Sequence, residues 1–143
     1  MSRARTWQYL FLLFIPASPA HPQAIISTIA GGTAVFRGNG GPALAATLGG
    51  VYGVATDAAG NVYATDRDNS LVVKISPNGT LTVIAGNGFS GYSGEGLRAT
   101  SGSLSIPIDL AVDPAGNVYL AENGADRVRK ITPDGIITTV AGG

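Results

Sequence analysis

The fold is decided by a 36-residue stretch that reads VYGVATDAAGNVYATDRDNSLVVKISPNGTLTVIAG at 51–86 and returns, without a gap, as PIDLAVDPAGNVYLAENGADRVRKITPDGIITTVAG at 107–142. Fifteen of the 36 aligned positions are identical. The preceding segments also match, because GNGGPA at 38–43 falls on GEGLRA at 94–99. The chain is therefore built on a tandem repeat of 56 residues, and such repeats indicate solenoids, propellers or similar arrays.

Each repeat contains four short runs rich in Val, Tyr, Ile and Thr, which favour pleated, half-buried strand positions. In the first repeat we expect strands at about 51–57, 61–66, 71–76 and 80–85, and in the second at positions 56 residues later. Four sequential antiparallel strands followed by a long Gly-rich link describe a propeller blade better than a sandwich, whose strands cross between sheets.

Turn residues separate the runs. Between the first two, DAAGN and DPAGN offer an Asp that can accept backbone N–H bonds and a Gly that can take a positive φ. Between the last two, the Asn-Gly of PNG and the Asp-Gly of PDG favour type I′ or related hairpin turns. The structural turn residues are Asp57, Gly60, Asn61, Gly79, Asp113, Gly116, Asn117 and Gly135. Tyr63 and Tyr119 recur on the second runs, where we expect them to pack in the core or between blades.

Composition excludes several classes of protein. The chain has 143 residues, of which 45% are hydrophobic and 13% charged, with 21 glycines. No cysteine is present, which excludes disulfides, zinc–thiolate sites and cysteine nucleophiles. Once the two arginines of the first residues are set aside, the chain is slightly acidic, so we expect no nucleic-acid partner.

The first residues, MSRARTWQYLFLLFIPASPA, place two arginines before an apolar run and small residues, as in a secretory signal peptide. We assign 1–24 to a signal peptide and short leader, cut after Ala20 or, less favourably, Ala24. The apolar run is about half the roughly 20 residues that span a bilayer, so we expect no stable membrane span after cleavage. The sequence thus predicts a secreted, periplasmic or cell-surface protein.

The strings GNGGPA, GVATDAAGNVYATD and DRVRKITPDGIITTVAG resemble the NHL repeat, particularly its form in exported bacterial proteins, over residues 25–143. The resemblance implies one four-stranded blade per repeat, here 51–86 and 107–142, with Gly-rich links at 32–50 and 87–106. It also implies a ring that commonly has about six blades.

Two blades cannot close a ring, and an open blade exposes apolar surface. The expected fold class is therefore all-β, a segment of about two blades plus one N-terminal strand at 25–30, and a fragment of a longer propeller. The alternative is self-association through the open faces, with three copies forming six blades. The additional strand counts against that alternative.

Motifs of enzymes and cofactor sites are weak. GNGFSG at 86–91 matches the dinucleotide fingerprint, but no helical pattern follows it. DRDNS at 66–70 alternates carboxylates as a calcium loop does, yet the later Gly and Glu of such a loop are missing. The single histidine is His21, beside the predicted cleavage point, so no Ser-His pair or histidine zinc site can be assembled. We expect no cofactor and no metal.

The turns where the repeats diverge most, 66–70 and 122–126, are the expected binding loops. The candidate binding residues are Asp66, Arg67, Asp68, Asn69, Glu122, Asn123 and Asp126. In gluconolactonase-like propellers Glu, Asn and Asp hold a divalent cation, but we interpret Asp66, Glu122 and Asn123 as exposed turns. Arg127, Arg129 and Lys130 form the one basic cluster, which we place on an exposed outer strand.

The leading hypothesis for function is a non-catalytic scaffold whose loops bind a protein, peptide or glycan outside the cytoplasm. One alternative is a fragment of a propeller hydrolase or lyase whose metal ligands lie in missing blades. A second is a structural adhesion segment of a larger surface protein.

Overall fold

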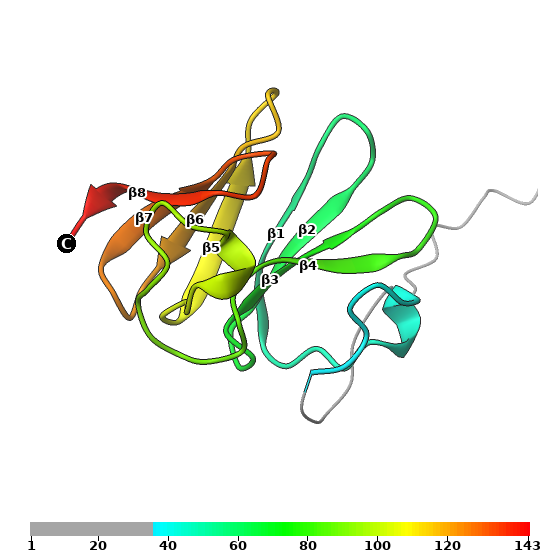
Figure 1. The fold of residues 1–143 in the computed structure, drawn as a ribbon. Helices are drawn as coiled ribbons and strands as arrows, with labels where there is room; N and C mark the ends of the chain where they lie inside the picture. Colours follow the sequence, from blue (N-terminus) through cyan, green and yellow to red (C-terminus); the bar gives the residue numbers. More distant parts are fainter. Residues whose placement is uncertain (1–35) are drawn as a thin grey trace, which may run out of the picture.

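The computed structural model describes residues 36–143, which form two four-stranded antiparallel sheets with strand orders β1-β2-β3-β4 and β5-β6-β7-β8 (Figure 1). The first sheet, blade 1, comprises β1 (Val51–Thr56), β2 (Val62–Asp66), β3 (Leu71–Ile75) and β4 (Leu81–Ala85). The second sheet, blade 2, comprises β5 (Pro107–Val112), β6 (Val118–Glu122), β7 (Arg127–Ile131) and β8 (Ile137–Gly142). The predicted all-β fold is confirmed, and every strand begins and ends within one residue of its expected bounds. The predicted leader at 1–24 and strand at 25–30 lie outside the described residues.

The first turn of each blade is formed as predicted. The Asp57 carboxylate accepts the backbone N–H groups of Ala59 and Asn61, each at 2.9 Å, and the Asn61 side-chain amide at 2.7 Å. Gly60 has a φ of +80°, a conformation that a β-carbon disfavours. Asp113 accepts the backbone and side-chain amides of Asn117 in the same way, at 2.8 and 2.7 Å.

The second turn differs from a type I′ turn. The N–H of Gly79 donates to the Ser76 carbonyl at 2.8 Å, and Gly79 is the residue of this turn with positive φ, at +83°. A type I′ turn needs positive φ at both central residues, but the first central residue here is Pro77, whose ring fixes φ near −65°. The turn is therefore of type I, followed by a left-handed glycine, and Gly135 with the same φ completes its counterpart in blade 2.

The links enter each blade by the same route. Each contains a short 3₁₀ helix, η1 (Ala43–Ala45) before blade 1 and η2 (Ala99–Ser101) before blade 2. The N–H groups of Ala43 and Ala99 donate to the carbonyls of Gly79 and Gly135, both at 2.8 Å. No helix within residues 36–143 is long and apolar enough to cross a membrane.

The two sheets face each other as neighbouring blades (Figure 1). One apolar cluster lies between them and joins blade 1 to blade 2 and its link. Its members are Tyr63, Val72, Ala85, Ala99, Leu104, Leu110, Val118, Leu120, Ile131 and Ile137. Tyr63 thus packs between blades, as predicted. The approach of the inner strands is close, because a β-carbon added at Gly53 would lie 2.6 Å from the Asp109 Cα.

A second apolar cluster lies between blade 1 and its own link, and it includes Leu48, Val73 and Leu81. The outward surfaces of the pair stay open: Val54 on blade 1 is 59% exposed and Val140 on blade 2 is 50% exposed. Two blades with one closed and two open faces form an incomplete ring.

Candidate functional site

The candidate binding loops lie where β2 turns into β3 and where β6 turns into β7. In each blade this turn packs against the end of the link, just before the first strand. In blade 1, the N–H of Arg67 donates to the Gly50 carbonyl at 2.9 Å. In blade 2, the N–H of Asn123 donates to the Ile106 carbonyl at 3.1 Å. These backbone hydrogen bonds fix each turn to its link, so the positions of the side chains on the turn are restricted.

Asp66 anchors the turn of blade 1 and is fully buried, so its interpretation as an exposed turn residue is wrong. Its carboxylate accepts the N–H groups of Gly49 and Asn69, each at 3.2 Å, and the Asn69 side-chain amide at 2.7 Å. A buried carboxylate must be satisfied by such donors, since leaving it unpaired is costly. Asp66 and Asn69 thus hold the loop in place, while the residues between them face solvent.

Those two residues, Arg67 and Asp68, are exposed. The Arg67 guanidinium donates to the Tyr52 hydroxyl at 2.7 Å and its carbon lies 5.1 Å from the centre of the Tyr52 ring. Asp68 accepts the N–H of Gly50 at 2.9 Å. Tyr52 is 57% exposed and was not among the predicted site residues. Its position on β1, next to the turn in space but 15 residues away in sequence, gives no local motif.

Glu122 takes the place of Asp66 in blade 2, and it too is buried rather than exposed. Its Oε1 accepts the N–H of Ser105 at 2.6 Å, and its Oε2 lies 3.5 Å from Nη1 of Arg129. Burial raises the pKa of Glu122 above its usual range, and the bond from Ser105 and the charge of Arg129 only partly oppose this. Asn123 of the same turn is exposed, in agreement with the sequence prediction, and Asp126 is exposed as well.

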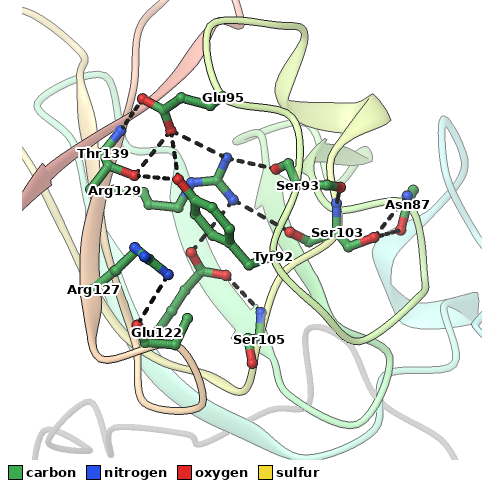
Figure 2. Close-up of polar contacts among 11 residues, drawn as sticks. Asn87, Tyr92, Ser93, Glu95, Ser103, Ser105, Glu122, Arg127, Arg129 and Thr139 are labelled. Carbon is green, nitrogen blue, oxygen red and sulfur yellow. Dashed lines mark hydrogen bonds and ion pairs between the residues drawn. The ribbon is translucent and has the colours of Figure 1, made fainter. Parts of the chain in front are cut away.

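Arg129 is also fully buried, which corrects its placement on an exposed outer strand. It lies on β7, the third strand of the blade, and the link covers that face. Its Nη2 donates to the Ser93 carbonyl at 2.8 Å and its Nη1 to the Ser103 carbonyl at 3.3 Å (Figure 2). Arg129 therefore ties two points of the link to the sheet. Within residues 36–143, Arg129 Nε and Glu122 Oε2 have no hydrogen-bond partner.

Tyr92 of the link covers this ion pair, and Figure 2 shows its ring among the two arginines and Glu95. Its ring centre lies 4.1 Å from the guanidinium carbon of Arg127 and 4.9 Å from that of Arg129. Glu95 accepts the N–H of Thr139 at 2.8 Å and the Tyr92 hydroxyl at 3.2 Å. The bond from Thr139 is the main reason that the pKa of Glu95 lies below its usual value.

Ile106, beside the blade 2 turn, adopts a φ of +51°. This left-handed conformation is uncommon for a β-branched residue and is found at positions that the surrounding structure holds in place. Its counterpart in blade 1 is Gly50, for which such a φ would carry no steric cost. Ile106 directly follows Ser105, whose N–H donates to the buried Glu122. The strained backbone and the buried carboxylate are therefore neighbours in blade 2.

The chemistry of these side chains suits binding through hydrogen bonds and stacking. The carboxylate oxygens of Asp66 and Glu122 interact with amide and guanidinium groups of the protein itself. Within residues 36–143, no three histidine, cysteine or acidic side chains gather into a group that could hold a metal ion. The groups at the surface are instead two Arg–Tyr pairs, the exposed Arg67 with Tyr52 and the half-buried Arg127 with the exposed Tyr92.

Neither a family model nor a curated protein matches the chain. Among solved structures, it is similar to a protein of unknown function from Bacteroides thetaiotaomicron, at 29% identity and a TM-score of 0.52, over 59% of this chain and 21% of that one. The chain is a β-propeller segment. The chain is also similar to virginiamycin B lyase from Staphylococcus aureus, at 22% identity and a TM-score of 0.49, over 65% of this chain and 27% of that one. A streptogramin B lyase structure matches at 19% identity and a TM-score of 0.49, over 65% of this chain and 26% of that one.

The segment spans about a quarter of the length of these proteins. Two of them are named as lyases, which contradicts the expectation that the protein is non-catalytic. Turn-rich repeats without a catalytic motif do not mark a propeller as non-catalytic, because residues from several blades can meet in one ring.

Proposed function

We propose that this chain supplies two NHL-type blades of an exported β-propeller, and that the propeller binds a protein, peptide or glycan at the blade ends formed by turns 66–70 and 122–126. The predicted leader at 1–24 supports export. The repeat motifs support the NHL type within the propeller fold.

The observation that carries the proposal is the contrast between buried anchors and exposed side chains in one turn. Asp66 is buried and fixes the loop, whereas Arg67 and Asp68 extend from it into solvent beside the exposed Tyr52 of β1. A ligand that binds there meets side chains already held in position, so less conformational entropy is lost on binding.

The exposed groups also define what the ligand must offer. Arg67 keeps donors free beyond its bond to Tyr52, and guanidinium groups favour carboxylates and flat rings. Tyr52 presents an aromatic face of the kind that stacks on sugars or peptide side chains. The expected ligand is therefore a peptide or glycan with acidic and planar groups.

The test uses arrays of acidic peptides and acidic glycans, probed with the purified chain and then with the double variant R67A/Y52A. We expect the variant to lose binding by about tenfold or more, the equivalent of at least one lost charge-assisted hydrogen bond. Arg98→Ala is the matched control, since Arg98 is an exposed arginine beside the opposite turn at Gly135. Equal loss in both variants, or none in R67A/Y52A, contradicts the proposal.

Binding at this face serves a propeller enzyme as well as a recognition protein. Any array probe that binds is therefore incubated with the protein and analysed by mass spectrometry. A shortened or rearranged probe would assign chemistry to the same face, and an unchanged probe would assign recognition.

A further inference from the structure

The packing between the two blades provides a template for a second contact. Blade 1 presents to blade 2 a forward face, built from Tyr63, Val72, Lys74 and Ile84. Blade 2 receives it on a back face, which includes Leu110, Val118 and the turn at Pro133. Because the repeats are equivalent, blade 2 has a forward face of its own, at Tyr119, Val128, Lys130 and Val140. Blade 1 likewise has a back face, at Val54, Val62 and Pro77.

Exposure separates the closed faces from the open ones. On the forward side, Val72 is fully buried, whereas its equivalent Val128 is half-buried. On the back side, Leu110 is 7% exposed and its equivalent Val54 is 59% exposed. The open faces thus carry the same residue types as the closed interface, but their side chains remain partly exposed. Exposed apolar surface of this kind marks an interaction site.

The open forward face also has the side-chain arrangement of the closed one. Tyr63 donates to Asp57 at 3.0 Å and lies 5.5 Å from the ammonium of Lys74. Tyr119 donates to Asp113 at 3.4 Å and lies 6.0 Å from the ammonium of Lys130. Forming a contact there would require no rearrangement of these groups, which lowers the cost of association.

A groove repeats in the same way. At the closed contact, Tyr63, Lys74 and Ile84 of blade 1 line a groove together with Arg98 and Thr100 of the second link and Pro133 of blade 2. On the open side of blade 1, a groove is lined by Pro42, Leu44 and Pro77, which are the equivalents of the second set. The open groove has one wall, and the missing wall corresponds to Tyr119, Lys130 and Val140.

We propose that a second copy of this chain occupies these faces head to tail, with the forward face of blade 2 on the back face of blade 1 of the next copy. In this register Val140 of one copy lies near Leu44 of its neighbour, as Ile84 lies near Thr100 within the chain. One chain carries both complementary faces, the open forward face of blade 2 and the open back face of blade 1. A second copy of the chain therefore offers a matching surface to each. The two faces differ, so the contact is heterologous and propagates until a ring closes. The pairing is built from residues 36–143 alone, and the strand predicted at 25–30 lies outside them.

The first test is the oligomeric state of the 143-residue chain by analytical ultracentrifugation over a hundredfold range of concentration. Wild type is expected to associate and Val140→Glu to stay monomeric, because a carboxylate would be buried in the contact. Leu97→Glu is the matched control, since Leu97 is 60% exposed but lies along the outer edge of β8, where its carbonyl accepts the N–H of Ile137. A monomeric wild type, or equal association of all three proteins, overturns the proposal and leaves the faces to another blade or partner.

The second test determines the register of the contact between copies. Because the native chain has no cysteine, cross-links form only at the introduced positions. The variants L44C and V140C, both at exposed positions, are treated with a short bismaleimide separately and as a mixture. Cross-linked dimers are expected in the mixture and not in either variant alone. Dimers of L44C or V140C alone would show a symmetric contact, and no dimer in the mixture would show no contact; either result overturns the proposal. Neither test involves the binding turns, so the array experiment fails or succeeds independently.

Discussion

Val73 in blade 1 and Arg129 in blade 2 occupy the same position of the third strand, and both are fully buried beneath the preceding link. Val73 packs against Leu48 and Leu81 in an apolar cluster. Arg129 instead donates hydrogen bonds to two link carbonyls and pairs with Glu122, which is also buried. One backbone arrangement is thus held by apolar packing in one blade and by buried charge in the other.

The difference shows what each solution provides. Apolar packing is non-directional and roughly proportional to the area buried. A guanidinium has donors in a fixed plane, so Arg129 specifies where Ser93 and Ser103 of the link must lie. Desolvation makes a buried pair a poor source of stability, but losing one partner is strongly destabilising. Blade 2 therefore depends on two residues at once, while blade 1 does not.

The largest effect is expected for Val73→Arg, which moves the blade 2 residue into blade 1. There the carboxylate at the position of Glu122 is that of Asp66, which already accepts the amides of Gly49 and Asn69. Overpacking costs about 1–3 kcal/mol and an uncompensated buried charge about 3–5 kcal/mol. The free energy of unfolding, measured in urea, should fall by about 4–8 kcal/mol, enough to unfold many domains. A loss below about 1 kcal/mol would mean that the site beneath the first link is not closed.

The next largest effect is expected for Glu122→Ala, which removes the buried partner of Arg129 and leaves the half-exposed Glu95, at 4.0 Å, as its ionic partner. We expect a loss of about 3–5 kcal/mol in urea unfolding. The triple variant E122D/A125N/R129V rebuilds the blade 1 arrangement of Asp66, Asn69 and Val73. It should return to within about 1.5 kcal/mol of wild type, because it removes the buried guanidinium and rebuilds the side-chain set that holds the other blade. Stability in the triple variant as low as in Glu122→Ala would contradict the equivalence of the two blades.

A smaller effect is expected for Gly53→Ala at the closed inter-blade contact. The new β-carbon would lie 2.6 Å from the backbone of Asp109, so the inner strands must separate, at a cost of about 1–3 kcal/mol. The matched control is Asp109→Ala, the equivalent position in blade 2, which should change the free energy of unfolding by about 0.5 kcal/mol or less. Equal effects would show that the inner strands do not touch as described.

The smallest effect is a dependence on acid. The side-chain amide of Asn61, helped by backbone N–H groups, lowers the pKa of Asp57 from 3.8 to about 2. A carboxyl whose pKa is lowered by folding stabilises the fold above its ordinary pKa, and this stabilisation is lost as pH falls through its folded value. Asp57→Asn should flatten the dependence of the urea midpoint on pH between 3.8 and about 2.

Burial raises the pKa of Glu122, so its contribution has the opposite sign: stability declines as pH rises through and above the ordinary carboxyl range. Urea midpoints at several pH values therefore separate the two carboxyls. An Asp57→Asn variant with an unchanged acid slope would contradict the assignment of that slope to the first turn.

The strands and turns were predictable because their signals are local. Pro77 and Gly79 stop one strand and start the next through their own φ preferences, and Asp57 forms its turn with residues up to four positions away. The sequence allowed a type I′ or a related hairpin turn, and Pro77 selects the related form, a type I turn followed by a left-handed glycine. That proline determines the backbone more strongly than the Asn-Gly pair after it does.

The buried pair was missed because its signal is not local. Charge favours the surface, so Arg129 and Glu122 were each placed there when considered alone. Yet the repeat alignment puts Arg129 on Val73, a position that alternation assigns to the interior in the first blade. A charged residue on an apolar position of one repeat, with an acidic residue at the end of the adjacent strand, is the pattern that could have identified the pair. Tyr52 and Tyr92 carry no such pattern, because only the fold brings them to the arginines.

A double-mutant cycle on Glu122 and Arg129 tests most directly whether the two side chains jointly replace apolar packing beneath the link. Urea unfolding of wild type, Glu122→Ala, Arg129→Val and the double variant gives the coupling free energy. We predict a double variant about 1–3 kcal/mol more stable than the sum of the single losses. Losses that add to within about 0.5 kcal/mol would show two independent residues and contradict the account.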